Sequence, residues 1–123
     1  PQYSYEHQGW RDIALSVARK YQPGDVLAFN IWFDIYPARH YLKKAFGSLP
    51  PELNITEETF SPDQMEELTT SCHRVILVGS FDRELEEKQL RMWLIRNRGQ
   101  TDIQLFHHTF LEIYPCSRQP VSP

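Results

Sequence analysis

The run RVILV at positions 74–78 most constrains how this chain can fold. Four successive aliphatic residues, most of them β-branched, predict a strand that is buried on both faces at the centre of a sheet. The run VLAF at positions 26–29 has the same character and follows the turn signal Pro23-Gly24-Asp25. Together, the two runs predict two fully buried strands.

Several other segments repeat apolar residues at helical spacing. The first has an apolar face made of Trp10, Ile13, Ala14, Val17, Ala18 and Tyr21. A second helix is expected from about Pro37 to Gly47, and a third begins at Ser61, a typical capping residue that is followed by proline. A fourth covers about residues 83–98 and ends before Gly99. Helices and strands therefore alternate along the chain.

Three more strands complete the predicted order: a weak edge strand at 53–55 and two strands at 103–106 and 110–114. Alternating strands and helices predict an α/β fold with a mostly parallel, Rossmann-like sheet in a three-layer αβα domain. Because only a short link joins the last two strands, we expect an antiparallel strand at the carboxy-terminal side. The length of 123 residues fits a single domain, residues 1–116, followed by a flexible tail at 117–123.

The charge balance excludes some classes of partner. The formal net charge is −3, and the 13 Lys and Arg residues are scattered among 16 Asp and Glu. Proteins that bind nucleic acid usually carry a basic stripe, so no nucleic-acid partner is predicted. No apolar run reaches the roughly 18 residues that a membrane span needs. The sequence does not begin with methionine, and we expect it to be a processed or excised piece of a longer protein.

Two places in the sequence supply candidate ligand-binding residues, because open α/β sheets bind ligands beyond the carboxyl ends of their strands. They are Asn30, Trp32, Asp34, Tyr36, Arg39 and His40 after the first run, and Ser80, Asp82 and Arg83 after the second. Aromatic rings with a few polar groups are typical of a sugar or nucleotide pocket. The alternative is that the aromatic residues pack in the core or an interface, and that Ser80 or Asp82 caps a helix.

No self-sufficient catalytic motif is present. Asp34 and Glu112 could act as acid and base only if the fold brought them together, and nothing in their spacing requires this. The adjacent residues His107 and His108 predict a surface turn rather than a metal site, because neighbouring side chains of an extended chain point to opposite faces. We predict no catalytic residue, no metal site and no cofactor.

The two cysteines leave two interpretations open. Cys72 precedes the strand at 74–78, and Cys116 follows the strand at 110–114. If these strands are antiparallel neighbours, the two Cα atoms could fall within the roughly 4.4–6.8 Å that a disulfide needs. If they are not, the cysteines are two separate thiols.

Four features, in order, resemble one family. They are Trp10-Arg11 opening an amphipathic helix, Pro23-Gly24-Asp25-Val26 entering a strand, Phe29-Asn30 leaving it with Pro37 and Tyr41 beyond, and the run at 74–78. Together they resemble the soluble carboxy-terminal domain of multi-spanning membrane glycosyltransferases related to the dolichyl-phosphate-mannose protein mannosyltransferases. The resemblance extends from about Gln8 to Tyr114, and it departs from the family's pattern at Ile31-Trp32, where small residues are expected.

This resemblance implies a location and a role. In such enzymes the transfer chemistry lies in the membrane part, and the soluble domain faces the periplasm or lumen and assists substrate or partner binding. The implied partners are the membrane-embedded part of the same polypeptide and a lipid-linked sugar or its acceptor. A Cys72–Cys116 disulfide would fit this oxidising, extracytoplasmic setting.

Two other functions are compatible with the sequence. The chain could be a free-standing, cytoplasmic α/β protein or enzyme that binds a nucleotide or a sugar. It could also be a protein interaction module that uses an exposed aromatic patch. Neither alternative requires membrane-spanning segments upstream, whereas the first interpretation does.

Overall fold

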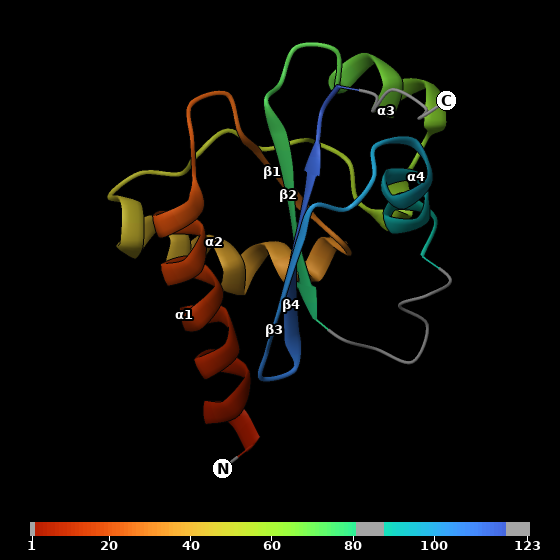
Figure 1. Cartoon of the computed structure of the whole chain (residues 1–123). Helices are drawn as coiled ribbons and strands as arrows, with labels where there is room; N and C mark the ends of the chain where they lie inside the picture. The colour runs from red at the N-terminus through yellow and green to blue at the C-terminus, as the bar shows by residue number, and fades with distance from the viewer. Residues whose placement is uncertain (1, 81–87, 118–123) are drawn as a thin grey trace.

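The computed structural model of the chain describes residues 2–80 and 88–117, with side chains from residue 8 onward. A four-stranded mixed sheet forms the centre of the molecule (Figure 1). Its strands are β1 (Val26–Phe29), β2 (Arg74–Ser80), β3 (Asp102–Phe106) and β4 (Thr109–Pro115), and their order in the sheet is β1-β2-β4-β3. β1 pairs with β2 in parallel, and the other two pairings are antiparallel. The α/β class is confirmed, and the prediction of a mostly parallel, Rossmann-like sheet is wrong.

The late hairpin explains the difference. β3 and β4 are joined by a tight turn in which His108 adopts a left-handed backbone conformation, with a φ of 55°. β4 then inserts between β3 and β2, pairing with β2 over its whole length from Arg74–Pro115 to Ser80–Thr109. A strand that follows its neighbour through such a turn is necessarily antiparallel to it. The predicted antiparallel strand at the carboxy-terminal side is confirmed.

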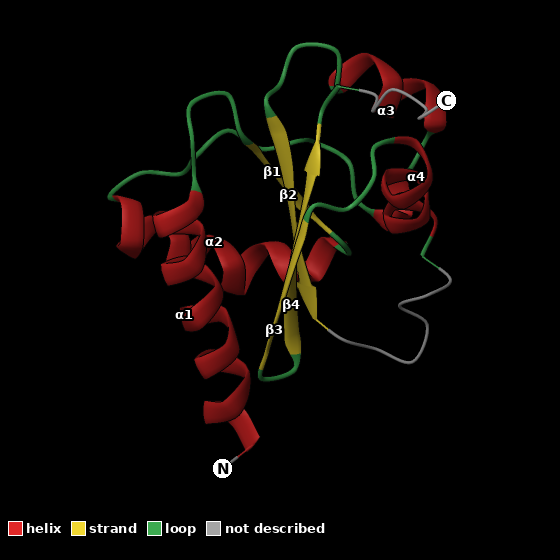
Figure 2. Ribbon diagram, in the orientation of Figure 1, coloured by secondary structure: helices red, strands yellow, loops and turns green. Residues whose placement is uncertain are grey.

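Helices lie on both faces of the sheet (Figure 2). They are α1 (Gln2–Lys20), α2 (Ile35–Phe46), α3 (Pro62–Leu68) and α4 (Gln89–Asn97). α1 and α2 pack against Ile76 and Val78 on one face, and α3 and α4 pack with Val75 and Leu77 on the other. Successive side chains of β2 point to opposite faces of the sheet, and helices cover both faces. This explains why the apolar run of β2 is continuous.

Local signals placed several helix ends correctly. α2 ends at Gly47, whose φ of 79° is the left-handed conformation typical of a helix cap. The side chain of Ser61 accepts a hydrogen bond from the Gln64 backbone at the start of α3. The predicted helix at 83–98 corresponds to α4, and residues 83–87 lie outside the described part of the chain. Among the described residues, no helix is both long enough and apolar enough to cross a membrane.

The prediction of an edge strand at 53–55 is wrong, because this segment is not a strand. The segment makes a single parallel bridge, between Glu52 and Leu27. The Leu53 N–H donates to the Leu27 carbonyl at 2.7 Å, and Leu53 and Ile55 are buried. The apolar side chains are used for packing, so their burial does not require a strand.

The end of the sheet where β1 and β2 begin, which we call the anchored end, is tied together by several links. Asp25, fully buried, accepts hydrogen bonds from the Arg74 guanidinium at 3.1 and 2.6 Å and from the Gln22 N–H at 2.8 Å. The hydrogen bond to Asp25 raises the pKa of Arg74 further above its usual value. Cys72 and Cys116 form a disulfide with Cα atoms 5.6 Å apart. Of the two interpretations of the cysteines, the disulfide is confirmed and the interpretation as two separate thiols is wrong.

Candidate functional site

The opposite end of the sheet, where β1 and β2 finish, presents an exposed aromatic patch formed by Trp32, Phe33 and Tyr36. Directly after β1 the chain forms a short 3₁₀ helix, η1 (Trp32–Asp34), which leads into α2. The side chains of Trp32 and Phe33 are each 53% exposed and Tyr36 is 68% exposed. The indole of Trp32 contacts the rings of Phe33 and Tyr36 edge to face, with centroids 5.6 and 6.3 Å apart. Of the alternatives considered for these aromatic residues, packing in the domain's own core is therefore wrong for all three rings.

A backbone contact fixes this patch in place. The Trp32 N–H points at the Glu58 carboxylate, with both oxygens 3.2 Å from the nitrogen. Glu58 belongs to a second 3₁₀ helix, η2 (Glu57–Thr59), and the Glu57 N–H donates to the Asn30 carbonyl at 2.8 Å. Glu57 in turn accepts from the first backbone N–H groups of α4. The patch is therefore held by three separate segments of the chain.

Trp32 also borders a hollow of about 250 Å³ beside the patch, which we call the Trp32 pocket. Its other lining residues are Phe29, Ile35, Arg39, Glu52, Leu53, Asn54, Ile55, Thr56 and Thr59. Two predicted residues, Trp32 and Arg39, therefore meet in one cavity. The remaining polar lining comes from the 52–59 segment, which the sequence did not single out.

A bidentate ion pair forms the polar wall of the Trp32 pocket. Arg39 donates to the Glu52 carboxylate through Nε at 3.0 Å and Nη2 at 2.6 Å. The hydrogen bond to Glu52 raises the pKa of Arg39, so the guanidinium stays charged throughout the accessible pH range. The Arg39 side chain keeps 44% of its surface exposed, whereas Glu52 keeps 12%. The pairing uses only part of the guanidinium, so Arg39 keeps further N–H groups that a ligand at the surface can reach.

Three further predicted residues form a polar junction between the ends of β1 and β2. Asp34, 2% exposed, accepts from the Ser80 hydroxyl at 2.7 Å and from the Ser80 N–H at 3.2 Å. Asn30 is fully enclosed, and no hydrogen-bond partner of its carboxamide lies among the described residues. Gly79 allows this close approach, because a Cβ there would lie 2.7 Å from the Asn30 Cβ. Asn30 and Asp34 therefore face the protein interior rather than a ligand.

The other predicted residues lie apart from the Trp32 pocket. Tyr36 projects from the surface, and His40 is exposed and packs its ring edge to face on Tyr41, with centroids 4.9 Å apart. Asp82 and Arg83 lie outside the described residues. Of the six residues named after β1, only Trp32 and Arg39 thus line the pocket.

Glu112, the other carboxylate considered for catalysis, has a different set of partners from Asp34. Glu112 is buried in β4 and accepts from Arg91 at 2.8 and 2.7 Å and from the Tyr114 hydroxyl at 2.7 Å. Burial, together with this bond to Glu112, raises the pKa of Tyr114. The Glu112 carboxylate is thus occupied by a structural network. Within residues 2–80 and 88–117, no group of three or more His, Cys, Asp and Glu side chains could hold a metal ion.

Comparison with known proteins adds no relative to this picture: no protein family, curated protein or solved structure matches the chain. The resemblance to membrane glycosyltransferases therefore stays a prediction from the sequence. The chemistry of the Trp32 pocket, by contrast, is defined by the residues that line it.

Proposed function

We propose that this chain is a non-catalytic, extracytoplasmic domain of a membrane glycosyltransferase, and that it binds a saccharide at the Trp32 pocket. The observation that carries the proposal is the pairing of a half-exposed indole with the bidentate Arg39–Glu52 pair in one hollow. The C–H face of a pyranose is apolar and packs on an indole, while its hydroxyl groups donate to and accept from planar polar groups. The pocket offers both kinds of surface side by side.

Two further features support this assignment. The Cys72–Cys116 disulfide is of the kind that forms and persists in oxidising compartments, in agreement with a periplasmic or luminal location. The pocket is open and about 250 Å³ in volume, which suits one or two sugar rings rather than a large cofactor. Asn54 adds a carboxamide that can both donate and accept hydrogen bonds.

The experiment is a titration of the ¹⁵N-labelled domain with a panel of mono- and disaccharides that includes mannose and mannobiose. We expect saturable shifts of the Trp32 indole N–H and of the amides in residues 52–59. Isolated protein–sugar contacts of this size are weak, so we expect dissociation constants of about 1 mM. Trp32→Ala and Arg39→Gln should each weaken binding about tenfold or more.

Matched controls come from the same surface. Phe33→Ala removes a ring with the same 53% exposure that does not line the pocket, and Lys43→Gln removes a nearby exposed charge of α2. Both variants should bind like the unmodified chain. Equal losses in Trp32→Ala and Phe33→Ala would contradict a pocket-specific site, and no shift with any sugar in the panel would contradict saccharide binding.

The non-catalytic part of the proposal has its own test. The purified domain should neither transfer nor hydrolyse sugar from lipid-linked or nucleotide-linked donors. Turnover of any of these donors by the folded domain would overturn the assignment.

The aromatic patch favours a second candidate function, protein interaction. Three adjoining rings, each more than half exposed, form a surface of the kind that proteins use as a binding anchor. Here the partner would be the membrane-embedded part of the same polypeptide. Phe33→Ala and Tyr36→Ala would then weaken assembly with that part without changing saccharide shifts, which separates the two functions.

A further inference from the structure

The two outer edges of the central sheet differ in how they are covered. At the edge of β1, the Leu27 N–H donates to the Pro51 carbonyl at 2.9 Å, and the Leu53 N–H donates to the Leu27 carbonyl at 2.7 Å. β3 forms the other edge, and within residues 2–80 and 88–117 it pairs with β4 alone (Figure 1). One edge of the sheet is therefore closed and the other is open.

The backbone groups of Ile103 and Leu105 form this open edge. The Thr101 N–H and hydroxyl both donate to the Ile113 carbonyl, at 2.8 and 3.1 Å, so this carbonyl faces β3. Because the direction of hydrogen bonding alternates along a strand, Ile113 and every second residue of β4 bond to β3. Their register partners in β3 are Asp102, Gln104 and Phe106. The N–H and C=O groups of the two residues between these partners therefore point away from β4.

Two apolar side chains are exposed beside the open edge. Side chains alternate between the faces of a strand, and Gln104, which accepts a hydrogen bond from the Ser16 hydroxyl, marks the face of β3 toward α1. Ile103 and Leu105 lie on the opposite face, where they are 45% and 65% exposed. Native sheets often protect an open edge with lysine or proline, and the β3 sequence DIQLF contains neither. This edge is therefore suited to pairing with another strand.

The edge of β3 is complementary to the same edge of a second copy of the chain. A two-fold axis at Gln104 places Ile103 opposite Leu105 of the second copy, and Leu105 opposite its Ile103. Because both residues have outward backbone groups, each such pair exchanges two hydrogen bonds. The four apolar side chains then meet on one face of the joined sheets, where cross-strand pairs of this kind are stabilising. Gln104 lies opposite its own counterpart, with Cα atoms about 4.5 Å apart.

Charge and topology also favour a pair of copies. The one charged side chain of β3, Asp102, is paired with Lys20 at 2.5 Å and would lie opposite the apolar Phe106 of the second copy. Like charges therefore do not face each other between the two β3 strands. Since the β1 edge is closed within each copy, association stops at two, whereas two open edges would allow a filament.

We infer that two copies of this chain associate through antiparallel pairing of their β3 strands, which joins the two sheets into one. Each copy contributes one five-residue strand, so the buried area is at the low end for a specific interface. We therefore expect a reversible dimer with a dissociation constant of about 10–100 µM. The inference does not depend on saccharide binding at the Trp32 pocket, because β3 contributes no residue to that pocket.

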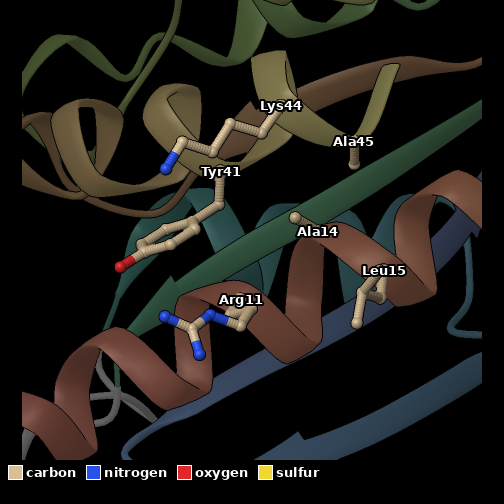
Figure 3. A pocket seen from close by; sticks show the side chains of 6 residues that line it. All are labelled: Arg11, Ala14, Leu15, Tyr41, Lys44 and Ala45. Atoms are coloured by element: carbon tan, nitrogen blue, oxygen red, sulfur yellow. The ribbon is translucent and has the colours of Figure 1, made fainter. Parts of the chain in front are cut away.

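Sedimentation equilibrium over a range of concentrations that spans this value tests the association. Leu105→Lys places a charge among the apolar side chains and should raise the dissociation constant at least about tenfold. Leu15→Lys is the matched control, because Leu15 is 47% exposed but borders the hollow between α1 and α2 (Figure 3), and it should dimerise like the unmodified chain. Both leucines are exposed, so folding is preserved, and a circular dichroism spectrum checks it. A chain that stays monomeric over the whole range would overturn the inference.

An introduced cysteine tests the position of the two-fold axis. In Gln104→Cys the two Cα atoms, about 4.5 Å apart, suit a disulfide, so mild oxidation should give a covalent dimer. His108→Cys lies at the hairpin turn, away from the axis, and should remain uncrosslinked. The native cysteines are bonded to each other and do not compete. Crosslinking of His108→Cys but not of Gln104→Cys, or a dimer that is lost in Trp32→Ala and kept in Leu105→Lys, would overturn the inference.

Discussion

The two ends of the central sheet are built in opposite ways. At the anchored end, Asp25 and Arg74 satisfy each other and the disulfide joins the segments that flank β2 and β4. At the other end, aromatic rings lie exposed and a buried carboxamide has no partner among the described residues. The difference separates stability from recognition: substitutions at the anchored end should change the free energy of unfolding, and substitutions at the other end should change binding.

The largest expected effect concerns the disulfide. Cys72→Ser with Cys116→Ser removes a bridge between residues 44 positions apart. The chain-entropy model then predicts a loss of about 3–4 kcal/mol in the free energy of unfolding. Urea denaturation with and without dithiothreitol measures it, and the reductant should have no effect on the double variant. Equal free energies of unfolding for the oxidised chain and the double variant would show that the disulfide does not stabilise the anchored end.

The buried ion pair should have the next largest effect. Asp25→Asn leaves the Arg74 guanidinium without its counter-charge, and we expect a loss of about 2–3 kcal/mol, less than for a fully enclosed pair because Arg74 keeps 21% of its side chain exposed. Glu58→Gln is the matched change at the other end, where the carboxylate accepts an exposed bond from the Trp32 N–H, and it should cost less than about 0.5 kcal/mol. Similar costs for the two variants, measured by chemical denaturation, would break the contrast between the ends.

Gly79→Ala tests whether a substitution at the end of the sheet opposite the anchored end can also change stability. A Cβ at this position would lie 2.7 Å from the Asn30 Cβ and 2.9 Å from the Phe110 ring. Because both neighbours are buried, we expect overpacking to cost about 1–2 kcal/mol although the residue lies at the recognition end. Thermal unfolding measures the loss, and chemical shifts of Asn30 and Phe110 should change with it. An unchanged melting temperature would mean that this end adapts easily, which would sharpen the contrast.

The smallest effect belongs to a surface pair at the anchored end. Lys20 contacts Asp102 at 2.5 Å and lowers the pKa of this carboxyl below its usual value. A carboxyl with a lowered folded-state pKa stabilises the protein above its unfolded pKa of about 3.9, and this contribution disappears as the pH falls through the folded-state pKa. Since Asp102 keeps 41% of its side chain exposed, the contribution is about 0.2–1 kcal/mol. NMR titration should show the pKa of Asp102 rising in Lys20→Ala, with Arg19→Ala as the unchanged control.

Features with a local cause were predictable from the sequence. The buried runs at β1 and β2, the stop of α2 at Gly47 and the Ser61 cap each depend on a few neighbouring residues, and all are present. Proximity of Cys72 and Cys116 required only that β2 and β4 be antiparallel neighbours, which they are.

Features that depend on distant partners were not predictable. A mostly parallel sheet was expected because helices alternate with strands. Instead, β4 pairs antiparallel with β2. Glu52 became part of the Trp32 pocket only because Arg39 of α2 reaches it, and no local pattern marks that pairing. Asn30 and Asp34 were candidates for ligand contact, yet the close packing at Gly79 and the bonds from Ser80 turn them inward.

The position of β4 in the sheet has a consequence for the order of assembly during synthesis. β4 follows the other three strands in the sequence but lies inside the sheet, between β2 and β3. Until residues 109–116 have been synthesised, the edge of β2 that pairs with β4 is open and Cys116, the partner of Cys72, is absent. An apolar strand with an open edge is a template for aggregation. The pairing of β4 with β2 therefore closes this edge and brings the two thiols together in the same step.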